Sequence, residues 1–113
     1  MSQYITVGMA IFNPKISFLE EQLKSIINQT KKPNKIVLID DFSNDFKSVK
    51  NKIDEVMSKS NIKYEIYQNE VNRGVNYSFK KSYQYFDDGI CFLSDQDDVW
   101  YETKIEEVTN FFK

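Results

Sequence analysis

Carboxylates gather at two points in the sequence, each directly after a run of apolar residues. The two groups are Asp40 and Asp41, after residues 36–39, and Asp95, Asp97 and Asp98, after residues 89–93. Negative charges held this close raise the free energy unless a cation or hydrogen-bond donors offset them. Carboxylate oxygens are the ligands that Mg²⁺ and Mn²⁺ prefer, and these ions also bind phosphate. The residues therefore predict a site for a divalent cation and a phosphate-bearing ligand.

A structural role for the same residues is the competing interpretation. Aspartate and serine often follow strands because their side chains cap the next helix. Asp41 or Ser43 could cap a helix that begins near residue 44, and Asp97 or Asp98 could cap a helix at the C-terminal end. We favour a site because both groups fall at the same edge of the predicted sheet.

Composition restricts the chemistry further. The chain has 113 residues and no histidine, which excludes histidine general bases, Ser-His triads and histidine-ligated zinc within it. Its three glycines form no glycine-rich phosphate loop. A net charge of −2 offers no basic surface for nucleic acid. Carboxylates, hydroxyls, amides and lysines are the groups that remain.

Targeting signals are not visible in the sequence. No apolar run approaches the roughly 20 residues that span a membrane, and no secretory signal opens the chain. The single cysteine, Cys91, forms no internal disulfide and fits a reducing compartment. We expect Cys91 to be a small buried residue within a strand. We also expect a cytoplasmic protein, with the inner face of the membrane as a second location for a full-length protein.

Hydrophobic periodicity predicts strands that alternate with helices. The strand-like runs cover residues 4–12, 36–39, 62–67 and 89–93. Helical periodicity follows each run, and Ser17 with Glu20 forms a capping-box pattern at the start of the first helix. This alternation predicts an α/β fold with a Rossmann-like, mostly parallel sheet and helices on both faces. Ligands bind beyond the carboxyl ends of the strands in such sheets.

The third helix is expected to follow the turn at Asn72–Gly74. Its buried face is predicted from helical spacing to consist of Val75, Phe79, Tyr83 and Phe86. Lys80 and Lys81 are expected to be solvated on the same helix.

Four segments, in this order, resemble a family 2 glycosyltransferase with the GT-A fold. Val7–Asn13 is similar to the first strand of that family, and Glu20–Thr30 is similar to its first helix. Ile39–Ser43 resembles the "DDGS" step, and Ser94–Trp100 resembles the DxD stretch in its rhamnosyltransferase-like "SDQDDxW" form. The chain is therefore similar to the N-terminal, nucleotide-sugar-binding half of a bacterial member.

The resemblance implies a pocket for a nucleotide base. The backbone around Ala10, Phe12 and Asn13 would line it. Asp41 would accept a hydrogen bond from the N3–H of uracil or thymine. Arg73 would either reach a phosphate or base or remain a surface residue at a helix start.

The resemblance also implies a diphosphate and metal site. Asp95 and Gln96 would lie near the ribose and diphosphate, and Asp97 with Asp95 would bind Mn²⁺ or Mg²⁺. Asp98 would support the metal ligands or cap the last helix.

Three positions depart from the family pattern. Phe42 replaces a glycine, so we expect the turn after Asp41 to avoid positive φ. Phe12 replaces a common tyrosine, and Ser78 replaces a common asparagine. Donor contacts from Arg73 to Ser78 are therefore left open.

The implied reaction is transfer of a sugar from a UDP- or dTDP-sugar to a saccharide or lipid-linked acceptor by an inverting enzyme, in cell-surface polysaccharide synthesis. In the family, the general base lies well downstream of the DxD stretch. We therefore expect residues 1–113 to be a single nucleotide-sugar-binding domain that lacks the acceptor-binding half, is inactive alone and self-associates as a homodimer.

A receiver-like signalling module that binds Mg²⁺ at its acidic rim is the alternative from another class. Such a module needs an aspartate at the end of its third strand and a lysine after its fifth. The third strand here ends at Gln68-Asn69, and no fifth strand is predicted.

Overall fold

The computed structural model describes residues 3–95 and 98–112, which form a four-stranded parallel sheet with helices on both faces. The strands are β1 (Ile5–Ile11), β2 (Lys35–Asp40), β3 (Lys63–Gln68) and β4 (Ile90–Ser94). The helices are α1 (Ile16–Ile27), α2 (Phe46–Met57), α3 (Val75–Ser82), the 3₁₀ turn η1 (Tyr83–Tyr85) and α4 (Lys104–Asn110). The predicted α/β class is confirmed.

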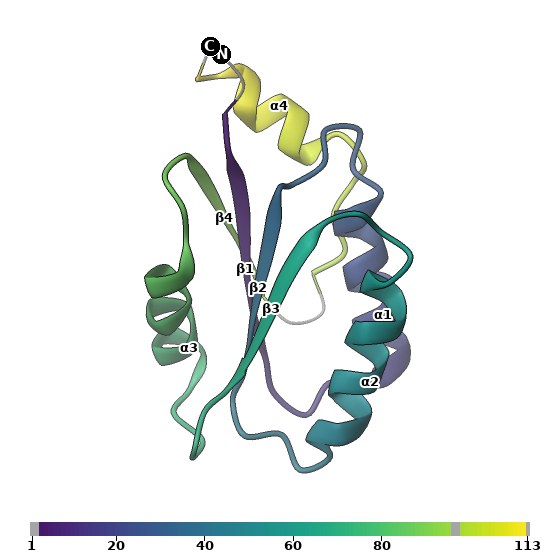
Figure 1. Cartoon of the computed structure of the whole chain (residues 1–113), viewed down its shortest axis with the longest axis vertical. Helices are drawn as coiled ribbons and strands as arrows, with labels where there is room; N and C mark the ends of the chain where they lie inside the picture. Colours follow the sequence, from purple (N-terminus) through teal and green to yellow (C-terminus); the bar gives the residue numbers. More distant parts are fainter. Residues whose placement is uncertain (1–2, 96–97, 113) are drawn as a thin grey trace.

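The strand order, β3-β2-β1-β4, brings the carboxyl ends of the strands to one edge. Ile11 lies opposite Asp40, and Asp40 lies opposite Gln68. The strands β1, β2 and β3 therefore end level with one another. The residues that leave these three strands emerge side by side, toward the bottom of Figure 1.

The two faces of the sheet are covered differently. In Figure 1, α1 and α2 lie on one face, α3 lies on the other, and α4 crosses the end where the strands begin. Buried side chains at helical spacing explain the first face. They are Leu19, Leu23 and Ile26 from α1, and Val49, Ile53, Val56 and Met57 from α2. Each such side chain contributes about 1.5–3 kcal/mol when removed from water.

The other face depends on small residues. Ser78 and Ser82 of α3 are buried. Of the residues predicted for its buried face, Val75 is 44% and Tyr83 52% exposed, so the prediction is wrong for these two, whereas Phe79 and Phe86 are half-buried. A Cβ atom at Gly8 of β1 would lie 2.6 Å from the Phe86 Cζ and 2.9 Å from the Ser82 Oγ. The close approach of Phe86 and Ser82 to this strand therefore requires a glycine at position 8.

The start of α1 also differs from the prediction. Lys15 occupies the N-cap without a side-chain cap bond, so Ser17 and Glu20 form no capping box. The Glu20 carboxylate instead pairs with Lys24 at 2.7 Å and with Lys52 of α2 at 3.3 Å. These ion pairs offer the carboxylate charged partners that a backbone N–H does not.

The predicted caps of the later helices are also wrong. Asp45, rather than Ser43, caps α2 by accepting a hydrogen bond from the Ser48 backbone N–H. The N-cap of α4 is Thr103, so Asp98 does not cap that helix.

Cys91 is exposed, contrary to the prediction that it is buried. The strand that carries it, β4, lies at the edge of the sheet, where β1 is its neighbour. Burial raises the pKa of the Cys91 thiol because part of the side chain is still removed from water.

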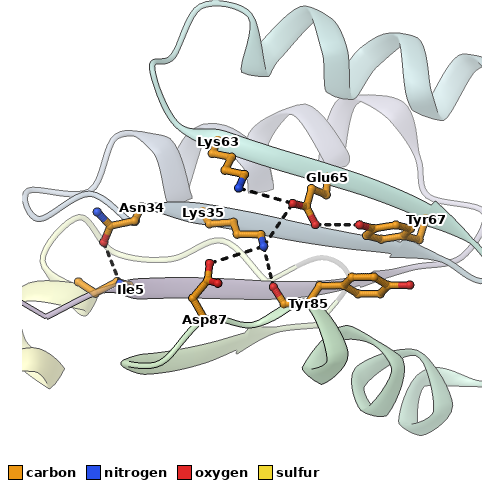
Figure 2. A network of polar contacts seen from close by, with 8 residues as sticks. All are labelled: Ile5, Asn34, Lys35, Lys63, Glu65, Tyr67, Tyr85 and Asp87. Atoms are coloured by element: carbon orange, nitrogen blue, oxygen red, sulfur yellow. Dashed lines mark hydrogen bonds and ion pairs between the residues drawn. The ribbon is translucent and has the colours of Figure 1, made fainter.

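A buried lysine ties three elements together near the start of the strands (Figure 2). The Lys35 ammonium donates to the carbonyl of Tyr85 at 2.7 Å and pairs with Glu65 at 3.2 Å and Asp87 at 3.6 Å. The Tyr67 hydroxyl donates to Glu65, and the rings of Tyr67 and Tyr85 stack with centroids 3.8 Å apart. The cluster holds η1 and the loop before β4 against β2 and β3.

The same contacts change the ionisation of two groups. Burial, followed by the hydrogen bond to Glu65, raises the pKa of Tyr67 to about 12. Burial would raise the pKa of Glu65, but hydrogen bonds from Tyr67 and Lys35 outweigh it and lower that pKa.

In the part of the chain that the structure describes, the helices are too short or too polar to cross a bilayer.

Candidate functional site

A cavity of about 320 Å³ lies at the carboxyl ends of the strands. One wall is the end of β1, with Ala10, Ile11 and Phe12. The opposite wall is the loop before α3 and its first turns, with Asn72, Gly74, Val75 and Ser78. Asp41 and Asp95, which follow β2 and β4, complete the lining. The cavity is thus mainly apolar, with a carboxylate at each of two strand ends.

Asp41 is buried in the wall of this cavity and held by three N–H donors. Its Oδ1 accepts hydrogen bonds from Asn69 Nδ2 at 2.8 Å and from the Arg73 backbone N–H at 2.7 Å. Its Oδ2 accepts one from the Gly74 backbone N–H at 2.8 Å. The donors offset the cost of burying a charge.

Asn69, the residue after β3, links Asp41 to α3. Its Nδ2 also donates to Ser78 Oγ at 3.1 Å, and its Oδ1 accepts from Lys81 Nζ at 3.0 Å. Lys81 is therefore half-buried and paired, and the prediction that it is solvated is wrong. Its neighbour Lys80 is exposed, as predicted.

The loops after β1 and β2 adopt strained backbone conformations next to the cavity. Phe42 has a φ of 64° and Asn13 a φ of 43°, so the expectation that Phe42 avoids positive φ is wrong. Buried Asp40 accepts hydrogen bonds from both the N–H and the hydroxyl of Ser43. The Ser43 Oγ in turn accepts from the Asn13 backbone N–H at 2.8 Å. These bonds hold the turn in a conformation that a phenylalanine otherwise avoids.

Asn13 and Arg73 use their side chains outside the cavity lining. The Asn13 Oδ1 accepts a hydrogen bond from the Asn44 backbone N–H at 2.8 Å, which joins the two loops. The Arg73 guanidinium lies over the Tyr77 ring, 5.4 Å from its centroid. Of the described residues predicted to bind nucleotide, Ala10, Phe12, Asp41 and Asp95 are those that line the cavity.

A buried glutamine of α1 positions Asp95. Gln22 Nε2 donates to Ser94 Oγ at 2.9 Å and to the carbonyl of Asp95 at 2.6 Å. The same carbonyl accepts from the Asp98 backbone N–H at 3.1 Å. The first helix therefore fixes the point at which the chain leaves β4.

The end of α1 holds the segment that follows. The Ser25 hydroxyl accepts a hydrogen bond from the Trp100 backbone N–H at 3.0 Å. Buried Gln29 donates to the carbonyl of Tyr101 at 2.7 Å and accepts from the Ile105 N–H at 3.0 Å. Ser25, in the last turn of α1, and Gln29, just after the helix, thus hold the chain that follows β4.

Two of the predicted site residues, Gln96 and Asp97, lie outside the described residues. Among residues 3–95 and 98–112, no group of three acidic, cysteine or histidine side chains is placed to hold a metal ion. Asp95 contributes a carboxylate of the type that Mg²⁺ and Mn²⁺ prefer, at the edge of the cavity.

The sequence compared with known families gives a clear match. Residues 6–113 match the profile described as Glycosyl transferase family 2. The chain belongs to this family. The receiver-like alternative has no such match among the families. A comparison with curated proteins found no match to the chain.

Solved glycosyltransferases share the fold of this family 2 chain. TarS from S. aureus superimposes with a TM-score of 0.81 at 20% identity, over 96% of this chain and 19% of TarS. TarS 1-349 in complex with UDP-GlcNAc superimposes with a TM-score of 0.73 at 21% identity, over 96% of this chain and 31% of the TarS chain. The mannosyltransferase PcManGT from Pyrobaculum calidifontis, in complex with GDP-Man and Mn²⁺, superimposes with a TM-score of 0.73 at 19% identity. The match covers 88% of this chain and 29% of PcManGT. The chain therefore has the GT-A fold and spans less than a third of the chain in each of these three structures.

Asn72 lines the cavity and was not predicted as a site residue from the sequence. Donor contacts from Arg73 to Ser78 were left open, and Gly74, Val75 and Ser78 of that segment line the cavity. Ile11 lies in the stretch around Ala10 and Phe12 that was expected to line it. The Asn-x-Gly turn before α3 was a signal for a tight loop, but it did not show that the loop faces Asp41.

Proposed function

We propose that the cavity binds the nucleoside diphosphate part of a sugar donor, with the base beside Asp41 and the diphosphate toward Asp95. The protein is then the donor-binding part of a metal-dependent inverting glycosyltransferase that uses a UDP- or dTDP-sugar. The observation that carries the proposal is the buried Asp41 carboxylate in the cavity wall, together with membership of family 2.

The proposed base preference follows from the carboxylate oxygens of Asp41, which accept hydrogen bonds. A carboxylate only accepts hydrogen bonds, so it matches a base edge that offers an N–H. Uracil and thymine offer N3–H, whereas N3 of cytosine is an acceptor and would be repelled. The apolar lining at Ala10 and Val75 suits the faces of a planar base.

Phe12, Asn13, Arg73 and Gln96 complete the proposed nucleotide site. Phe12 lines the cavity and is 43% exposed, and its ring is proposed to pack against the base. Asn13 would act by fixing the adjoining loop through Asn44. Arg73 would exchange its contact with Tyr77 for one with phosphate.

For the metal, Asp95 and Asp97 are the proposed ligands, and Mn²⁺ or Mg²⁺ the proposed ion. A bound ion of this kind would neutralise charge on the diphosphate leaving group. Gln22 would hold the Asp95 backbone in place for it. The PcManGT complex with Mn²⁺ supports metal use in this fold, and the TarS complexes with UDP and UDP-GlcNAc support the choice of uridine nucleotides.

The acceptor is proposed to be a saccharide or lipid-linked saccharide, in cell-surface polysaccharide synthesis. Residues 1–113 are proposed to form a single donor-binding domain. Self-association is expected because the exposed fraction is 88% for Phe111, 61% for Phe112 and 40% for Leu93 of the edge strand β4. Light scattering at tens of micromolar should give the mass of a homodimer, and a monomeric mass would contradict this expectation.

Calorimetric titration with UDP, dTDP, CDP and ADP in the presence of Mn²⁺ tests the function. We expect UDP and dTDP to bind at least about 10-fold more tightly than CDP and ADP, since an unsatisfied buried hydrogen-bonding group costs about 1–3 kcal/mol and about 1.4 kcal/mol is tenfold in affinity. Asp41→Ala should remove the difference, whereas Asp45→Ala, at an exposed helix cap outside the cavity, should retain it. Circular dichroism checks that both variants fold. Equal affinities of the unmodified protein for all four nucleotides would overturn the proposal.

A further inference from the structure

A line of hydrogen bonds runs from the cavity wall to α3. It begins at Asp41, passes through the carboxamide of Asn69 and ends at the ammonium of Lys81. We propose that Asn69 and Lys81 are positioning residues that hold the Asp41 carboxylate in one orientation and thereby set the nucleotide preference of the site. This inference rests on the proposed function.

The two charges determine which way the Asn69 amide points. Asn69 is 2% exposed, so water does not replace its partners. Its oxygen faces the Lys81 ammonium at 3.0 Å, and its nitrogen faces Asp41 at 2.8 Å. A flipped amide would place oxygen against a carboxylate and N–H₂ against an ammonium, which is repulsive at both ends. Lys81 therefore selects the orientation in which Asn69 donates to Asp41.

Ser78 fixes the remaining hydrogen of the Asn69 amide. Its Oγ accepts from Asn69 Nδ2 at 3.1 Å, and Ser78 is fully buried on α3. Ser78 and Lys81 are three residues apart on this helix, so they lie on the same face. One helix face thus supplies both the acceptor and the donor that the amide needs.

The orientation of Asp41 matters because its acceptor capacity is nearly filled. A carboxylate oxygen accepts about two hydrogen bonds. Oδ1 accepts from Asn69 and from Arg73, whereas the structure gives Oδ2 one donor among the described residues, Gly74. Oδ2 is therefore the oxygen with capacity for a ligand, and a ligand that donates an N–H is the one that matches it. When Asn69 is released, Oδ1 also has spare capacity and the carboxylate can rotate.

The first experiment uses the free protein and needs no ligand. NMR measures hydrogen exchange of the Asn69 side-chain amide in the unmodified protein and in Lys81→Met, Lys81→Arg and Lys80→Met. We expect exchange to be at least about 10-fold faster in Lys81→Met, because a hydrogen-bonded anchor of about 1.4 kcal/mol is lost. Lys81→Arg should restore protection of the Asn69 amide against exchange. Lys80→Met is the matched control, because Lys80 is the exposed neighbour of Lys81. Unchanged exchange in Lys81→Met would overturn the proposal.

The second experiment measures the ratio of the CDP and UDP dissociation constants for the same variants. We expect the ratio to fall about 5-fold or more in Lys81→Met and to be retained in Lys81→Arg and Lys80→Met. Lys81→Gln keeps an N–H donor and replaces Lys81→Met if circular dichroism shows that the latter is unfolded; a smaller fall in the ratio is then expected.

The outcomes separate this inference from the proposed function. Faster exchange with an unchanged ratio would show that Lys81 only stabilises the fold, and would overturn the inference while UDP binding stands. A protein that shows no preference for UDP over CDP would overturn the proposed function, and with it the role of Lys81 in base preference. The exchange measurement would still report whether Lys81 orients Asn69.

Discussion

The Oδ2 of Asp41 accepts a hydrogen bond of 2.8 Å from the backbone N–H of Gly74, which lies 33 residues later and is the N-cap of α3. Glycine has no side chain with which to cap its own helix, and Gly74 has a φ of 93°. The carboxylate at the end of β2 therefore supplies a negative charge near the positive end of α3, where it is stabilising. The same group lines the cavity, so the residue that we propose to bind the base also has a structural role.

Asp41→Asn should lower the free energy of unfolding by about 2–4 kcal/mol, because the amide nitrogen would face N–H groups that now donate to a buried charge. Urea unfolding measures the change. Asp45→Asn is the matched control at an exposed cap, where asparagine still caps and the expected change is under about 0.5 kcal/mol. Similar values for the two variants would show that the contacts of Asp41 contribute little.

Phe42→Gly should make the protein more stable than Phe42→Ala by about 1 kcal/mol, because the left-handed conformation costs a side chain about that much and costs glycine little. The backbone φ of Phe42 is 64° in the native protein. Both substitutions remove the exposed ring, so the difference between them reports backbone strain alone. Urea unfolding of both variants tests the difference. Equal stabilities would mean that the bonds of Asp40 to Ser43 do not impose strain.

Stability should fall as pH rises above about 10, the pKa of tyrosine in the unfolded chain. The pKa of Tyr67 is raised to about 12, so the folded protein binds this proton more tightly than the unfolded chain. The corresponding stability is fully present below about pH 10 and is lost as pH rises toward about 12. Urea unfolding at about pH 8 and about pH 11 should show a smaller loss in Tyr67→Phe than in the unmodified protein.

Tyr83→Phe is the control for loss of a tyrosine hydroxyl, since Tyr83 is 52% exposed. Its free energy of unfolding at about pH 8 should equal that of the unmodified protein. Tyr4 and Tyr64 also have raised pKa values, Tyr4 chiefly through burial and Tyr64 chiefly through a hydrogen bond to Asp54. Part of the loss of stability with rising pH should therefore persist in Tyr67→Phe. If Tyr67→Phe loses as much stability between about pH 8 and about pH 11 as the unmodified protein, the loss does not come from Tyr67.

Mn²⁺ should bind weakly to the free protein and much more tightly once UDP is present, because phosphate oxygens add to the few protein ligands. Linkage requires Mn²⁺ to tighten UDP by the same factor. Asp97→Asn should abolish this coupling, whereas Asp98→Asn should retain more of it. Titration of UDP with and without Mn²⁺ measures the factor for each variant. If Asp98→Asn is the variant that loses coupling, the ligand assignment is wrong.

Local patterns were enough to predict the elements and the edge at which the site lies. The apolar runs and helical spacings predicted four strands and the helices between them, because each pattern depends on neighbours in the sequence. The positions of Asp41 and Asp95 after strands placed both at one edge, because parallel strands bring their carboxyl ends together. The resemblance to family 2 rested on the same short segments and is confirmed by the match over residues 6–113.

Tertiary structure alone decided how these residues are held. Lys81 pairs with an amide twelve residues away, and Gln22 reaches a carbonyl 73 residues away. Gly8 leaves room for Phe86 and Ser82, which lie more than 70 residues later in the chain. Each contact depends on the register of the sheet and on the path of a loop. Short-range periodicity contains neither, so it predicted a solvated Lys81 and an apolar buried face for α3. The sequence by itself determined which groups reach the edge of the sheet, and the packing of α1 and α3 decided which of them are fixed there.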